Sequence, residues 1–275
     1  MTGEFPKPQL NALPLGAHSV SALTDEALFE ACGVRIAFTG REGGVSEGPY
    51  ASLNTADHVG DDLECVLRNR AIVLGALGAP DAPLVVLNQV HGVEIVRVHD
   101  VADAPAVANQ AKEGADAIVV DVAGVATLLS FADCLPLIIV APDGRFAVVH
   151  VGWRGALVGI VGKAVRALAE GDENAAAATG FNAYIGPHIR SECFETSEDI
   201  AQQFADVYGA DVLADSRRVS LARAVTADLV RAGMSPDRIA DAGVCTMCDS
   251  DRYFSYRASG GTCGRHAAAA INLSS

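Results

Sequence analysis

Short runs of apolar residues are the dominant pattern along this chain. Most of them are rich in Val and Ile and are bounded by Gly, Pro or Asp, which is typical of buried strands. The predicted strands cover residues 33–40, 84–90, 95–98, 117–121, 126–131, 137–141, 146–151 and 182–186. Two further runs, 252–257 and 267–273, are predicted to form a closing pair of strands.

Other segments place their apolar residues at helical spacing. One begins at Asp61 and Asp62 and a second follows Gly155, so both are predicted to be amphipathic helices, the second of them long. The remaining predicted helices cover about 197–208, 220–232 and 235–240.

The order of these elements indicates the fold class. Strands come first, helices follow, and strands return near the C-terminus, without the regular alternation that produces a parallel sheet. We therefore expect an α+β fold, a layered sandwich in which a mixed β-sheet or sheets are covered by helices. Residues 1–30 are expected to be a loosely organised, variable lead-in, and residues 31–275 a single domain. The Ala-rich stretch 174–179 is interpreted as a helix end or a loop within it.

Composition and charge exclude several classes of protein. Half of the 275 residues are hydrophobic and 20% are charged, which is ordinary for a globular protein with a buried core. A net charge of −14 argues against nucleic acid or an anionic membrane as a partner, because both favour clustered Lys and Arg. No apolar run approaches the roughly 20 residues of a membrane span, and the start of the chain does not resemble a secretory signal.

The cysteines bear on location. There are seven, an odd number that is unevenly spread, and a chain of this size does not need disulfides for stability. We therefore expect a cytoplasmic protein. The pattern leaves its oligomeric state, monomer or dimer, open.

Three polar side chains lie where predicted strands end. His91 follows an apolar run, Cys134 lies in a turn between two apolar strands, and His150 precedes the glycine-containing turn into a helix. Side chains at neighbouring strand ends can converge although they are distant in sequence. Two imidazoles and one thiolate suit zinc, and three protein ligands leave a fourth position for water or substrate. The sequence thus predicts one catalytic zinc ion.

The same three residues allow two other interpretations. A buried Cys is often simply a small apolar side chain, and a His beside a strand is often only hydrogen-bonded. A Cys-His pair can also act as nucleophile and base, without any metal ion.

Two arginines are candidates for binding phosphate, which such an acidic chain has to hold locally. Arg41 is followed by Gly43 and Gly44, whose backbone N–H groups can approach an anion, although a plain turn has the same pattern. Arg154 is placed at a predicted helix N-terminus, where the helix dipole favours an anion, although an ion pair there is the alternative.

Asn54 and Asp133 complete the set of candidates. Asn54 is interpreted as a substrate ligand or as a turn cap. Asp133 is interpreted as a catalytic residue that orients a ligand histidine, or as a turn residue. Arg257 and Arg265 are weaker candidates, because a role in conformation or at a sheet edge fits them equally.

A second metal site is suggested by four residues near the C-terminus. Cys245 and Cys248, followed by Cys263 and His266, have a spacing close to that of a zinc ribbon. The predicted strand 252–257 lies between the two pairs. We therefore interpret the four residues as core or hairpin positions.

Six short motifs occur in a fixed order along the chain, namely REGGVSEGPYASLN, NQVHG, ADCLPL, HVGWRG, YIGP and FSYR…GR. Together they resemble the YfiH family, also called the laccase-domain or multicopper polyphenol oxidoreductase family, from about residue 35 to the C-terminus. The resemblance implies a YfiH-like layered fold, a catalytic domain over residues 31–275, and one zinc ion bound by His91, Cys134 and His150.

The resemblance also implies an activity. Members of the family cleave adenosine, inosine and methylthioadenosine with phosphate to the free base and the sugar 1-phosphate, and they can deaminate adenosine. The expected partners are therefore a purine nucleoside and phosphate. The alternatives are a cysteine or zinc hydrolase, an amidase that edits a peptidoglycan precursor, and a non-enzymatic metal-buffering or partner-binding protein.

A copper polyphenol oxidase is the least favoured interpretation. Such oxidases need several copper ions with many His ligands, and this chain has seven widely scattered His residues. Imidazole also suits copper, so copper could still occupy the predicted zinc site.

Overall fold

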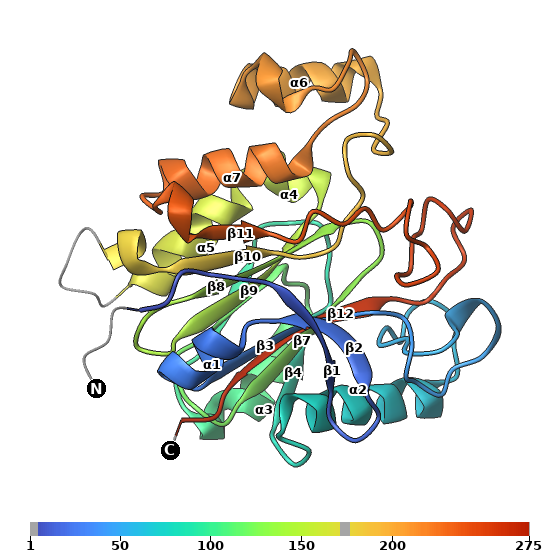
Figure 1. The fold of residues 1–275 in the computed structure, drawn as a ribbon, viewed down its shortest axis with the longest axis vertical. Coiled ribbons are helices and arrows are strands. Elements are labelled where there is room, and N and C mark those ends of the chain that lie inside the picture. The colour runs from blue at the N-terminus through green and yellow to red at the C-terminus, as the bar shows by residue number, and fades with distance from the viewer. Residues whose placement is uncertain (1–4, 171–176, 275) are drawn as a thin grey trace.

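Two β-sheets of six strands each form the centre of the fold (Figure 1). The computed structural model describes residues 5–170 and 177–274. In spatial order, the first sheet contains β1 (Asn11–Leu15), β2 (Val20–Thr24), β3 (Val34–Thr39), β12 (His266–Asn272), β7 (Ala126–Phe131) and β4 (Leu84–Val86). The second contains β11 (Ile239–Asp241), β10 (Asn182–Ile185), β8 (Leu135–Val140), β9 (Phe146–Val151), β6 (Ala117–Val120) and β5 (Ile95–Val98).

Burial on both faces explains why the central strands are apolar along their whole length. In β9, Phe146 and Val148 belong to the core between the two sheets, together with Phe131 of β7. The alternate residues Ala147 and Val149 belong to a second core, under the helices. Because successive side chains of a strand point to opposite faces, a strand buried on both sides reads as a continuous apolar run.

Helices cover the outer face of each sheet, which gives four layers (Figure 1). On the first sheet, α2 (Leu63–Leu77) contributes Val73, Leu74 and Leu77 to the outer core. The second sheet is covered by α4 (Trp153–Leu157) and α5 (Ile160–Ala169). On these pack α7 (Leu221–Arg231) and, further from the sheet, α6 (Glu198–Tyr208). The core between the sheets also receives side chains from α1 (Glu26–Cys32) and α3 (Ala104–Ala111). The predicted α+β layered sandwich is confirmed, with two mixed sheets.

Of the predicted closing pair of strands, 267–273 is confirmed as β12, but the strand at 252–257 and the pairing of the two are wrong. Residues 252–257 form turns rather than a strand, and β12 pairs instead with β3 and β7. Tyr253 and Phe254 are nevertheless buried. Their burial within a folded loop explains the strand-like composition that misled the prediction.

Two predicted helices also differ from the structure. At 235–240, a single 3-10 turn (Pro236–Arg238) is followed by β11, which pairs in parallel with β10. The long helix predicted after Gly155 begins at Trp153 and is divided into α4 and α5. Gly159 separates the two with a φ of 81°, a left-handed conformation that interrupts a right-handed helix.

The N-terminal part of the chain is more ordered than expected. Residues from Asn11 onward form β1 and β2, which extend the first sheet, and α1 follows. The sequence also missed α3 and overestimated the length of β4. Of the Ala-rich stretch, 174–176 lie outside the described residues, and Ala177–Gly180 is a short 3-10 turn. Within the described part of the chain, every helix is too short or too polar to cross a membrane.

Candidate metal centre and its cavity

His91, Cys134 and His150 come together at one end of the space between the two sheets. His91 follows β4 in an irregular segment, Cys134 lies between β7 and β8, and His150 belongs to β9. Each offers one ligand atom, and these three atoms lie within 4.8 Å of one another. The two imidazole rings meet edge to face, with centroids 4.7 Å apart. The geometry therefore allows one metal ion to bind all three side chains.

The buried carboxylate of Asp116 fixes the two histidines. It accepts hydrogen bonds from the backbone N–H groups of His91 (2.9 Å) and Gly92 (2.6 Å). It also lies 2.7 Å from Nδ1 of His150, and its side chain is fully buried. Because an ionised carboxylate only accepts, Nδ1 of His150 carries a proton, and Nε2 is the nitrogen that can bind a metal ion once its own proton is released.

Gly152 makes room for His91. A Cβ atom at this position would lie 2.4 Å from Nδ1 of His91, closer than any real contact. The glycine of the HVGWRG motif is therefore required because the imidazole packs directly against its backbone.

Cys134 and His150 favour each other's charged forms, a thiolate and an imidazolium. Burial opposes charge on Cys134, but His150 and hydrogen bonds from both histidines outweigh it and lower the pKa of Cys134 to about 6. Burial likewise opposes charge on His150, yet Cys134 and Asp116 raise the pKa of His150 to about 9. Asp116 is buried, but its hydrogen bond from His150 keeps the pKa of the carboxyl below its usual value. Cys134 is thus predisposed to be a thiolate, the form that binds metals.

The hydrogen bonds of Asp133 differ from the predicted contact with a ligand histidine. Asp116, not Asp133, holds a ligand histidine. Asp133 has a φ of 84°, and its carboxylate accepts hydrogen bonds from Oγ1 of Thr246 and from the backbone N–H of Arg257, both at 2.7 Å. It therefore ties the Cys134 turn to the loops at Thr246 and Arg257, although it also lines the cavity described next.

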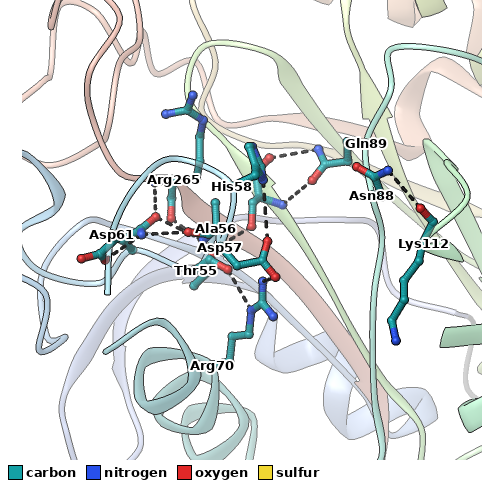
Figure 2. Close-up of polar contacts among 12 residues, drawn as sticks. Thr55, Ala56, Asp57, His58, Asp61, Arg70, Asn88, Gln89, Lys112 and Arg265 are labelled. Carbon is teal, nitrogen blue, oxygen red and sulfur yellow. Dashed lines mark hydrogen bonds and ion pairs between the residues drawn. The ribbon is translucent and has the colours of Figure 1, made fainter. Parts of the chain in front are cut away.

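A cavity of about 370 Å³ opens in front of the three ligands. Its wall contains the aromatic side chains of Phe131, Trp153, Phe194 and Tyr256 and the basic side chains of His58, Arg257 and Arg265. Arg265 is held over the ring of Tyr256, at 5.6 Å. Figure 2 shows Arg265 beside the loop that carries His58. The cavity thus combines apolar surface with positive charge, although the whole chain is acidic.

Gln89 links the segment that carries His91 to β7, the neighbour of β4 in the first sheet. Its side-chain amide donates to the carbonyl of Ser130 and accepts from the N–H of Ser130, both at 2.9 Å (Figure 2). The bidentate contact holds the segment that carries His91 beside the end of β7. Gln89 and Ser130 also line the cavity.

None of the three residues predicted to bind substrate or phosphate lines this cavity. Arg41 donates to the carbonyls of Ala51 and Ser250, so its guanidinium is used inside the fold. Asn54 is fully buried, and its Oδ1 accepts the backbone N–H of Arg265 at 2.9 Å. Arg154 is exposed and stacks on Trp153, with 4.7 Å between the guanidinium carbon and the ring centroid.

The sequence missed Asp116 and underrated Arg257, Arg265 and His58. Asp116 directly precedes the wholly apolar β6, and an unexplained carboxylate at the start of a buried strand was the available signal. The basic residues come from turns, whose position relative to the cavity follows from tertiary structure alone.

The fold and the site together define a class: a two-sheet α+β protein with a His-Cys-His group that could hold a metal ion at a cavity. Comparison with known proteins identifies the family. The family model for multi-copper polyphenol oxidoreductase laccase matches residues 35–273, and the chain belongs to that family.

Relatives and solved structures agree with this assignment. A purine nucleoside phosphorylase from Xylella fastidiosa is 35% identical over 236 residues, covering 82% of this chain and 87% of that protein. Adenosine deaminase RL5, from an unknown prokaryotic organism, is 31% identical over 226 residues, covering 78% and 85%. The crystal structure of YlmD from Geobacillus stearothermophilus matches with a TM-score of 0.82 and 29% identity, over 95% of this chain and 100% of that one. The YfiH protein of Bacillus licheniformis matches with a TM-score of 0.83 and 26% identity, over 94% and 98%. The resemblance expected from the six motifs is confirmed.

Proposed function

We propose that this chain is a zinc-dependent purine nucleoside enzyme. It would cleave adenosine, inosine and methylthioadenosine with phosphate to the free base and the sugar 1-phosphate, and it would also deaminate adenosine. The observation that carries the proposal is the convergence of His91, Cys134 and His150 on a cavity that also contains two arginines. The relatives named purine nucleoside phosphorylase and adenosine deaminase support the same substrate class.

The donor set fits zinc. Two neutral imidazoles and one thiolate are ligands that zinc prefers, and Asp116 leaves Nε2 of His150 available. When bound, a zinc ion would supply a Lewis acid beside the substrate. Cys134 would then be held as a ligand rather than act as a nucleophile.

The cavity walls fit the two parts of the proposed reaction. Phosphorolysis requires an anion to be held near the sugar, and Arg257 and Arg265 are cationic side chains that line the cavity, whereas burial and the charge of Arg265 lower the pKa of His58. Aromatic rings such as those of Trp153 and Tyr256 offer apolar surface on which a purine can stack. The guanidinium groups of Arg257 and Arg265 also donate to backbone carbonyls, but these two residues line the cavity, which Arg41 and Arg154 do not. We therefore propose Arg257 and Arg265 as phosphate ligands in place of Arg41 and Arg154.

Asn54 supports this arrangement indirectly. Its Oδ1 accepts the backbone N–H of Arg265, and its Nδ2 donates to Asp61 at 2.8 Å. These contacts fix the backbone from which the Arg265 side chain extends. Asn54 is thus proposed as a positioning residue rather than as a substrate ligand.

The test is the fate of adenosine with and without phosphate, followed by chromatography of adenine and inosine. Adenine is expected only when phosphate is present. Inosine is expected without phosphate, and with phosphate part of it should be cleaved further to hypoxanthine. Both products should fall by roughly 100-fold or more in Cys134→Ala, because loss of a ligand removes the ion. Cys65→Ala is the matched control, since Cys65 lies in α2, outside the ligand group.

Arg265→Gln separates the two activities. It should raise the KM for phosphate by about tenfold or more, because a charged hydrogen-bond donor is lost, and leave deamination nearly unchanged. If the zinc-loaded protein releases no adenine at any phosphate concentration, the proposed phosphorolysis is excluded.

A second candidate is a cysteine hydrolase, an amidase acting on a peptidoglycan precursor. Cys134, His150 and Asp116 are arranged as nucleophile, base and orienting carboxylate. In that reaction Sγ of Cys134 attacks the amide carbon, His150 passes the thiol proton to the leaving amine, and water then releases the acyl group. Metal-free protein should then hydrolyse a cell-wall peptide without phosphate and lose that activity when iodoacetamide alkylates Cys134. Activity that requires bound metal would exclude this candidate.

A further inference from the structure

A second group of potential metal ligands lies outside the cavity. The sulfur atoms of Cys193, Cys245 and Cys248 lie within 4.8 Å of one another, and Sγ of Cys193 is 3.3 Å from Sγ of Cys248. Cys193 belongs to the loop after β10, and the other two belong to the loop after β11. The spacing of the sequence had suggested a different partner pair, Cys263 and His266, for Cys245 and Cys248.

The structure places that other pair elsewhere. Sγ of Cys263 lies 3.3 Å from Nη1 of Arg265, and His266 is buried at the start of β12. Neither residue belongs to the cysteine group. The cysteine that completes the group, Cys193, lies more than fifty residues upstream, where no local spacing could reveal it.

We propose that Cys193, Cys245 and Cys248 form a second metal site, which binds a zinc ion through three thiolates. A tetrahedral zinc ion with Zn–S bonds of about 2.3 Å places its sulfur ligands about 3.8 Å apart. The observed separations, 3.3 Å between the sulfur atoms of Cys193 and Cys248 and at most 4.8 Å within the group, lie on either side of that distance. The backbone N–H of Arg190 points at Sγ of Cys245, at 3.4 Å, a contact that stabilises a thiolate.

The site is accessible to an ion. Cys248 is exposed, and Cys193 lines a surface hollow of about 420 Å³. Binding would convert three thiols to thiolates and release their protons to solvent, with no change in oxidation state. Solvent would occupy the remaining coordination position, because the described residues offer three ligands in this group.

The position of the site suggests what a bound ion would do. The two loops already meet through backbone bonds between His188 and Val244 (3.3 Å) and between Thr246 and His188 (3.1 Å). Residues next to the cysteines form part of the cavity: Phe194 and Ile189 line it, and Thr246 bonds to Asp133. An ion bound by the three cysteines would therefore join the loops that form one wall of the cavity.

The experiment is metal analysis of protein purified with reductant and loaded with zinc, then freed of excess ion. About two zinc ions per chain are expected in the unmodified protein and about one in Cys248→Ser. Cys248 is the best position to change, because its side chain is exposed and its loss leaves no cavity in the core. Cys65→Ser is the matched control and should keep both ions.

Cobalt then shows which ligands hold the ion. Cys134→Ala, loaded with Co²⁺, should keep a near-ultraviolet thiolate charge-transfer band, which disappears when Cys248→Ser or Cys193→Ser is added. Two results would overturn the proposal: a zinc content that is undiminished in Cys248→Ser, or a Cys193–Cys248 disulfide whose reduction restores no zinc uptake. If the unmodified protein binds zinc at the cysteines but neither releases adenine nor deaminates adenosine, only the proposed nucleoside chemistry is contradicted.

Discussion

The two groups of ligand side chains in this protein are built in opposite ways. His91, Cys134 and His150 come from the ends of strands in both sheets, and the buried Asp116 fixes the histidines from behind. The cysteine group is assembled from two surface loops, and Cys248 is exposed. A site on strand ends, with side chains held by a second layer of contacts, is suited to chemistry, because its geometry is fixed before substrate arrives.

The cysteine group differs from the His-Cys-His group because its three thiols lie on loops. Their positions depend on the loops, so an ion bound there stabilises the loops in return. Thr246 connects the two groups, since it is the neighbour of Cys245 and bonds to Asp133, the neighbour of Cys134. The following changes test how far the two groups are independent.

The largest effect is expected from Asp116→Asn. An amide at this position can donate to Nδ1 of His150, which would move the imidazole proton to Nε2 and remove the lone pair that binds metal. Zinc affinity at the His-Cys-His group should fall by about 10–100-fold, while the cysteine group keeps its ion. Competition with a coloured chelator measures the zinc affinity of each group. Asp143→Asn, in the exposed β8–β9 turn, is the control, and equal losses in both variants would contradict the role given to Asp116.

A smaller effect is expected from Gly152→Ala. The added Cβ would lie 2.4 Å from Nδ1 of His91, so the imidazole or the backbone has to shift. We expect a loss of about 1–3 kcal/mol in the free energy of unfolding, measured with urea, together with weaker zinc binding.

Gly75→Ala is the matched control for this change. Gly75 lies inside α2, and a Cβ there would have no neighbour within 4 Å. This variant should gain about 0.5–1 kcal/mol in the free energy of unfolding, because glycine weakens a helix interior. Unaltered zinc binding in Gly152→Ala would show that His91 is free to move.

The contrast between the two groups also explains what the sequence could predict. The central strands of both sheets were visible as apolar runs, because burial on two faces forces Val and Ile into consecutive positions, whereas β1, β2 and β11 were missed. The three ligands were visible for the same reason, since His91, Cys134 and His150 interrupt or end such runs. Apolar periodicity is a local property, and these features depend on it.

Features that depend on long-range contacts were not predictable. Tyr253 and Phe254 have strand-like character but lie buried in turns, so composition alone misassigned their segment. Cys193 joins Cys245 and Cys248 only because the loops after β10 and β11 meet, and these strands are neighbours in the second sheet. The role of Asp116 likewise follows from the return of β9 beside β6.

The smallest effect, and the most informative about independence, is expected from Thr246→Val. The change removes the Oγ1 donor to Asp133, which keeps its bond from the N–H of Arg257. We expect a loss of about 1 kcal/mol in the free energy of unfolding, because one buried hydrogen bond is lost at nearly constant volume. Zinc affinity should fall slightly at both groups, since Cys245 and Cys134 each lie next to one end of the broken bond. Thr196→Val, which removes an exposed hydrogen bond, should change neither affinity. A loss confined to the cysteine group would mean that the strand framework alone holds Cys134, and that the loops can loosen without disturbing it.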